Sequence, residues 1–125
     1  MALTGAASET GAGAFISDST TTPTTLVTAS GGAGKIVRIE KLLICNHDTS
    51  NNVTLDLYKV PSGGAVSSND YKFVLGLNIG PSNGNGGVED IREVAGMILE
   101  NGDSLRARAG TASKLKFDLS YWVES

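Results

Sequence analysis

The chain has 125 residues, the usual length of a single domain, and it carries 13 acidic against 10 basic side chains. This mildly acidic balance argues against nucleic acid as a partner, because binding to phosphates needs a clustered excess of basic residues. The apolar runs fall far short of the roughly 20 residues that a membrane-spanning helix needs, so we expect no membrane partner. The single cysteine, Cys45, cannot form an internal disulfide, and its apolar neighbours predict a buried, unreactive thiol.

The N-terminal segment, residues 1–22, consists mostly of Ala, Gly, Ser and Thr, and Phe15 and Ile16 are its only bulky pair. Such a segment buries too little apolar surface to offset the entropy lost on ordering. The sequence therefore predicts a flexible arm over residues 1–22 and one domain over residues 23–125. We expect Phe15 and Ile16 to anchor this arm on a neighbouring subunit. The alternative is a frayed terminus without a role.

Short β-type segments follow one another after residue 23. Residues 35–46 are rich in Val, Ile and Leu, with apolar residues on both faces near the end, which predicts a central strand or one that also meets a partner. Asn101-Gly102 is a strong hairpin signal. The strands that we expect cover residues 24–29, 35–46, 53–58, 71–79, 88–94, 97–99, 105–109 and 115–123.

The number and spacing of these segments predict the fold class. About eight short strands, with turns at roughly 8 to 12-residue intervals, are typical of an antiparallel β-sandwich. No connection is long enough to hold the crossover helix of a parallel unit. We expect an all-β protein with either jelly-roll or immunoglobulin-like connections, since hydrophobic periodicity does not encode topology.

Residues able to support catalysis or metal binding are few. His47 is the only histidine and lies in a polar turn, and no Gly-x-Ser-x-Gly motif marks a nucleophile. Cys45 and His47 supply at most two zinc ligands. Asp48, Asp70 and Asp103 lie at predicted strand ends, where aspartates satisfy the backbone groups of turns. We therefore predict a protein that is not an enzyme, with no catalytic residues, no metal and no cofactor.

Three more side chains are candidate interface residues besides Phe15 and Ile16. Arg106 and Arg108 stand opposite the apolar row of their strand, where they form either a solvated, partly paired face or a contact with an acidic protein surface. Trp122 falls opposite the apolar row of the last strand. It is therefore either an exposed interface anchor or a side chain packed beneath the N-terminal arm.

Four segments of the sequence, each part of a predicted strand or turn, are similar to segments of a known type of protein. They are Lys35-Ile36-Val37-Arg38-Ile39, a strand ending at Cys45-Asn46, a strand ending in Val-Pro-Ser-Gly-Gly at residues 60–64, and an Asn-Gly-Asp turn at residues 101–103. Together they resemble the small β-sandwich virion proteins of tailed bacteriophages. The likeness covers residues 34 to 123 and carries over no catalytic residue.

This resemblance implies a structural part of a virion that is assembled in the cytoplasm of the bacterial host. The first expectation is a capsid decoration (cement) protein that binds and stabilises the shell of major capsid protein as a homo-oligomer, with a trimer favoured. A neck, tail or fibre accessory protein fits the same sequence. A carbohydrate-binding module is a third alternative, although sugar sites usually present several exposed aromatics and the chain has three Phe, three Tyr and one Trp.

Overall fold

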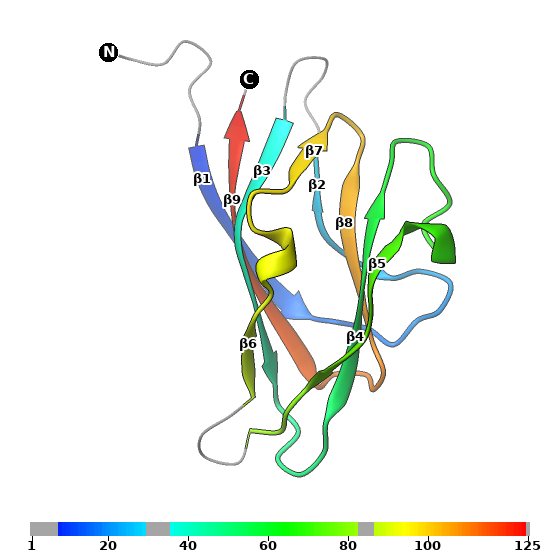
Figure 1. Ribbon diagram of the computed structural model, residues 1–125, viewed down its shortest axis with the longest axis vertical. Coiled ribbons are helices and arrows are strands. Elements are labelled where there is room, and N and C mark those ends of the chain that lie inside the picture. Colours follow the sequence, from blue (N-terminus) through cyan, green and yellow to red (C-terminus); the bar gives the residue numbers. More distant parts are fainter. Residues whose placement is uncertain (1–7, 30–35, 83–86, 125) are drawn as a thin grey trace.

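The computed structural model describes residues 8–29, 36–82 and 87–124, which form two antiparallel sheets packed face to face (Figure 1). Sheet A contains, in spatial order, β1 (Ser8–Phe15), β9 (Leu115–Glu124), β3 (Ile36–Asn46) and β6 (Val88–Asp90), and β7 (Ile98–Glu100) also pairs with β3. Sheet B contains, in order, β2 (Thr24–Thr28), β8 (Ser104–Ala109), β4 (Val53–Val60) and β5 (Lys72–Ile79). Two short 3₁₀ helices complete the described elements, η1 (Asn69–Tyr71) and η2 (Arg92–Val94). The predicted all-β antiparallel sandwich is confirmed.

The connections between strands identify the type of sandwich. The chain passes from one sheet to the other at each connection except β4 to β5 and β6 to β7. In immunoglobulin domains the first two strands share a sheet, whereas β1 and β2 lie in different sheets here. The strand order is therefore that of a jelly roll, in which the chain wraps around the core as paired Greek keys.

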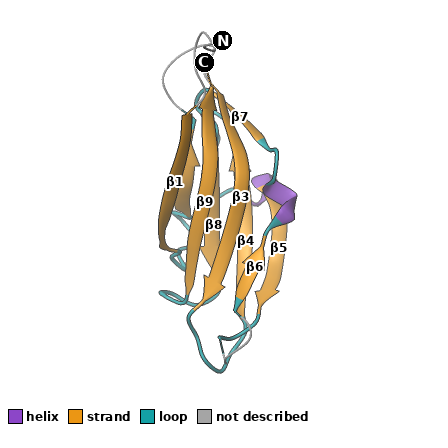
Figure 2. Cartoon of the chain, turned by 90° about the vertical axis from the view of Figure 1, so that its left-hand side faces the viewer, coloured by secondary structure: helices purple, strands orange, loops and turns teal. Residues whose placement is uncertain are grey.

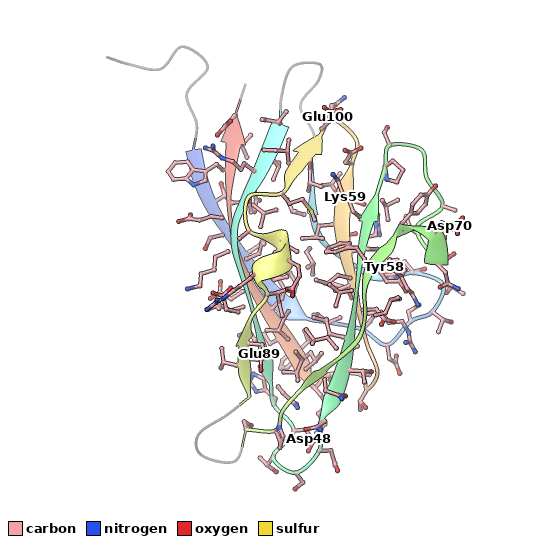
Figure 3. The ribbon with its side chains drawn as sticks, viewed as in Figure 1. Asp48, Tyr58, Lys59, Asp70, Glu89 and Glu100 are labelled. Atoms are coloured by element: carbon pink, nitrogen blue, oxygen red, sulfur yellow. The ribbon has the colours of Figure 1, made fainter. Side chains whose placement is uncertain are left out.

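The core fills the space between the sheets with side chains from both inner faces (Figure 3). Period-two alternation places one side of each strand there, and each fully buried large apolar side chain contributes roughly 1.5–3 kcal/mol of stabilisation. Because β3 runs between β9 and the short strands β6 and β7, its predicted central position is confirmed. The large apolar side chains that are fully buried include Ile16, Ile39, Leu42, Ile44, Leu55, Leu57, Ile79, Ile91, Leu99, Leu105 and Leu115.

The N-terminal segment differs from its prediction. Residues 8–15 are not a free arm but strand β1, which pairs with β9 from Ser8↔Val123 to Phe15↔Lys116 without a register shift. Ile16 follows with its side chain fully buried, and its N–H donates to the Leu115 carbonyl at 2.7 Å. This ladder of backbone hydrogen bonds, together with Ile16, supplies the stabilisation that side-chain composition does not reveal. The sandwich thus includes residue 8 onward, and residues 1–7 of the expected arm lie outside the described residues.

The turn at Asn101-Gly102 also differs from its prediction. β7 pairs with β3 in sheet A and β8 belongs to sheet B, so the turn joins two sheets instead of closing a hairpin. The N–H of Gly102 donates to the Ala29 carbonyl at 2.7 Å, and the Asp103 carboxylate accepts from the backbone N–H of Ser62 at 3.1 Å. The local signal identified a turn correctly, but it carries no information about which strands lie beside each other.

Candidate protein interface

The outer face of sheet B carries Arg106 and Arg108, and both side chains bind other parts of the same chain. Arg106 donates from Nη1 to the Pro23 carbonyl at 3.3 Å. Arg108 donates from Nε to the Asp18 carbonyl at 3.1 Å. Both contacts reach the segment that connects β1 to β2. The two guanidinium groups therefore hold this segment against sheet B, which is an intramolecular role.

The groups of a polar cluster beside these arginines also find their partners within the same chain. The Asp56 carboxylate lies 3.3 Å from Lys72 Nζ and 3.7 Å from an Arg108 nitrogen, and it accepts from the Gly76 N–H at 2.7 Å. Lys72 Nζ lies 5.4 Å from the ring centroid of Tyr58, whose side chain is buried within the molecule (Figure 3). The chain thus engages the polar side chains of β8 and β4 on sheet B with its own groups, whereas β5 leaves Phe73, Leu75 and Leu77 exposed.

The outer face of sheet A presents apolar side chains that remain accessible (Figure 2 looks onto this sheet from outside). One row crosses four strands, because register places Phe15 beside Lys116, Lys116 beside Cys45, and Cys45 beside Val88. Phe15 is 46% exposed and Val88 is 58% exposed. Half-buried Leu43 stands two residues before Cys45 on the same face of β3. This row lies at the end of sheet A where β1 terminates.

A second row lies toward the other end of the same face. Trp122 of β9 is paired with Arg38 of β3, and Arg38 is paired with Ile98 of β7. Trp122 is half-buried and Ile98 is 37% exposed. Arg38 also forms an ion pair with Glu124. We call the two rows together, Phe15, Leu43, Cys45, Val88, Trp122 and Ile98, the apolar outer face.

An open groove of about 640 Å³ lies on the apolar outer face. The backbone of Gly11 and Gly13 contributes part of its lining, since these positions of β1 have no side chain to fill the space. Apolar side chains of β3 and β6 line it as well, together with the charged side chains of Lys116 and Asp118. At the end of β1, the rings of Phe15 and His47 meet edge to face with centroids 5.2 Å apart. The groove combines an apolar surface with charged neighbours, as protein interfaces do.

The turn after β3 is held by Asn46 and Asp48 and has a structural role. Asn46 is fully buried, and its Nδ2 donates to the carbonyls of Asn51 and Ile79, each at 3.0 Å. Asp48, at the lower end of the molecule in Figure 3, accepts from the N–H groups of Ser50 and Asn51 at 2.9 Å. These two backbone hydrogen bonds lower the pKa of the Asp48 carboxyl below 3.8. The expectation that this aspartate satisfies turn backbone groups is therefore confirmed.

The five residues proposed from the sequence as an interface lie in three places. Phe15 and Trp122 share the outer face of sheet A, Ile16 is buried in the core, and Arg106 and Arg108 contact the chain's own segment on sheet B. With its side chain 0% exposed, Ile16 has no surface to offer a partner in this fold.

Sequence reasoning missed part of the apolar outer face. Leu43 and Val88 were not singled out, and the thiol of Cys45 is half-buried on that face, so the expectation of a buried thiol is wrong. The apolar residues on both faces of β3 were the one signal that could have identified Leu43 and Cys45.

Among residues 8–29, 36–82 and 87–124, no group of three or more His, Cys, Asp or Glu side chains is placed to hold a metal ion. Within the same ranges, no helix has the length and apolar character required to cross a membrane. Comparison of the chain with protein-family models, with curated proteins and with solved structures finds no match.

Proposed function

We propose that the chain is a non-enzymatic structural protein of a bacteriophage virion, and that it acts as a capsid decoration protein on the shell of major capsid protein. One observation carries this proposal: on the outer face of sheet A, the accessible side chains of Phe15 and Val88 lie in one row across four strands, beside an open groove. Grouped apolar side chains on the surface of a globular domain mark contacts with another molecule.

The form of this surface favours a protein partner over a small ligand. Small-molecule sites enclose most of the ligand that they bind. Here the groove is an open hollow on the face of a sheet, lined by Leu43, Cys45 and Val88 and by the charged side chains of Lys116 and Asp118. A broad face of this kind suits a second folded surface.

The identity of the partner comes from the sequence resemblance to small virion proteins. The strand that ends at Cys45-Asn46 and the turn at residues 60–64 carry that resemblance, and Cys45 itself lies on the apolar outer face. A decoration protein binds its shell in many copies, so each copy needs only a modest contact area for the whole coat to be stable. The protein would reach the particle in the cytoplasm of the bacterial host.

The test is to add the purified chain to particles assembled from the same phage genome with this gene deleted. Co-sedimentation measures binding, and cryo-electron microscopy locates the added density. Density distributed over the capsid faces is the expected result. Density confined to the neck, tail or fibres would replace the decoration assignment with the accessory-protein alternative. Absence of binding to any part of the particle would overturn the proposal.

A further inference from the structure

The outer backbone edge of β1 is free to pair with another strand. In an antiparallel ladder, alternate residues direct their N–H and C=O groups toward the same neighbour. The N–H of Ile16 donates to Leu115, so the even-numbered residues of β1 face β9 and the odd-numbered ones face away. In the described part of the chain, β9 is the only strand paired with β1. The backbone groups of Gly11, Gly13 and Phe15 therefore point outward from the sheet.

The other sheet edges are less suited to such pairing. Proteins protect their edges with short strands and bulges, which interrupt the regular spacing of hydrogen-bonding groups. β6 and β7 have three residues each, and β2 has five with a register shift between Thr25 and Val27. β5 has register shifts opposite Leu57, and Gly76 within it has a φ of 60°. β1 has eight residues in continuous register and one charged residue, Glu9.

Gly11 supplies a separate observation about this edge. No positive φ requires a glycine there, and a Cβ added to Gly11 would meet no atom nearer than the Leu119 carbonyl oxygen at 3.9 Å. At Gly13, by contrast, a Cβ would lie 3.0 Å from the Phe117 carbonyl oxygen. Within the residues that the structure describes, neither a steric contact nor the backbone conformation requires a glycine at position 11, whose missing side chain leaves part of the groove open. Glycine inside a strand often marks a place where another molecule or backbone comes close.

We propose that β1 pairs in antiparallel fashion with β1 of a second copy, which gives a two-fold symmetric dimer. An antiparallel copy presents the same two-residue spacing of donors and acceptors, so this edge is complementary to itself. With the symmetry axis at Gly13, Phe15 of each copy lies opposite Gly11 of the other. A cross-strand aromatic ring covers an edge glycine well, and Phe15 is 46% exposed in the single copy.

The dimer follows from β1 alone and does not depend on the proposed function. It joins the two copies of sheet A into one continuous sheet and brings their apolar outer faces side by side. Each copy has one β1 edge, and that edge pairs with one other, so the assembly closes at two copies. The edge geometry thus favours a dimer over the trimer that the sequence resemblance suggested.

The test measures the solution mass of the full chain over a concentration series by light scattering and sedimentation. Gly11→Pro removes an outward N–H and leaves the bonds to β9 intact, while Gly11→Ala keeps that N–H and serves as the matched control. We expect a dimer for the wild type and for Gly11→Ala. Because symmetry removes two hydrogen bonds at once, Gly11→Pro should raise the dissociation constant about tenfold or more.

Amide hydrogen exchange gives a second measurement at the same edge. The exchange of Gly13 and Phe15 amides should slow as the wild-type concentration rises, and it should stay fast in Gly11→Pro. If Gly11→Pro fails to fold, as judged by circular dichroism, Gly11→Lys tests the same contact by setting a charge opposite Phe15. A monomeric wild type, a trimer, or a dimer that survives Gly11→Pro or its replacement Gly11→Lys would overturn the proposal. Particle binding is a separate assay, so either proposal can fail alone.

Discussion

At the scale of single residues, Asn46 connects the end of β3 to sheet B. Its amide nitrogen donates to the carbonyl of Ile79 in β5, and its Oδ1 accepts from the N–H of Asp48 at 2.8 Å. The side chain is fully buried, and the hydrogen bond to the Ile79 carbonyl is buried as well, so loss of the side chain leaves a buried carbonyl without its partner. An unsatisfied buried polar group costs about 1–3 kcal/mol. This one amide therefore contributes to the stability of the fold, although it lies in a core of aliphatic residues.

Replacement of Asn46 by Ala should lower the free energy of unfolding by about 2–4 kcal/mol, because several partners lose their hydrogen bonds together. Chemical denaturation with urea measures the change. Asn78→Ala is the control, since Asn78 is exposed on the neighbouring strand β5 and should alter stability by less than about 0.5 kcal/mol. Equal effects of the two substitutions would contradict the structural role of Asn46.

At the scale of elements, β1 shows what a sequence does and does not reveal about a strand. Period-two alternation correctly predicted β4, β8 and β9, because each has one apolar face. β1 has no such pattern, since its sequence SETGAGAF has little apolar surface and its stability comes from pairing with a strand about 100 residues later. Pairing between distant segments leaves no local mark. For the same reason the jelly-roll order and the partners of β7 were not predictable.

Substitutions of the neighbouring residues Phe15 and Ile16 distinguish a strand of the sandwich from a flexible arm in the N-terminal segment. If β1 belongs to the sandwich, Ile16→Ala should reduce the free energy of unfolding by about 2–5 kcal/mol, because it empties a fully buried site. Phe15→Ala should change the stability of the single copy by less than about 1 kcal/mol, since Phe15 is half exposed. Thermal and urea unfolding of both variants at low protein concentration would check this. Similar small losses of stability for both variants would instead support the prediction that this segment is a flexible arm.

At the scale of the whole molecule, the two sheets differ in how they meet their surroundings. In sheet B, Arg106 and Arg108 bind the segment that connects β1 to β2, and Asp56 of β4 pairs with Lys72 of β5. Only β5 of this sheet keeps large apolar side chains exposed among the described residues. Sheet A carries the apolar outer face, and the sequence indicated it only through Trp122, Phe15 and the two-sided apolar pattern of β3. Which of these side chains share a face depends on register, which follows from the complete fold.

A charge placed on sheet A should weaken particle binding, whereas one placed on sheet B should not. Val88→Asp puts a carboxylate at a 58% exposed position of the apolar outer face, and burying it against a partner is unfavourable. We expect the affinity for particles to fall about tenfold or more, or ~1.4 kcal/mol. Leu75→Asp, at a 72% exposed position of β5, is the matched control and should bind as the wild type does. If Val88→Asp bound particles as tightly as Leu75→Asp does, the apolar outer face would be ruled out as the binding surface.

The adjacency of the first and last strands has a consequence for engineering. Ser8 pairs with Val123, so β1 begins where β9 ends, at the end of sheet A away from Phe15 and Val88 (Figure 1). A short linker between these strand ends would turn them into a hairpin, and the chain would then open at another exposed turn, such as residues 61–64. In such a circular permutant, a protein fused to the new termini would be attached at the turn of residues 61–64 and no longer beside the ends of β1 and β9. The outer faces of both sheets would keep their present arrangement.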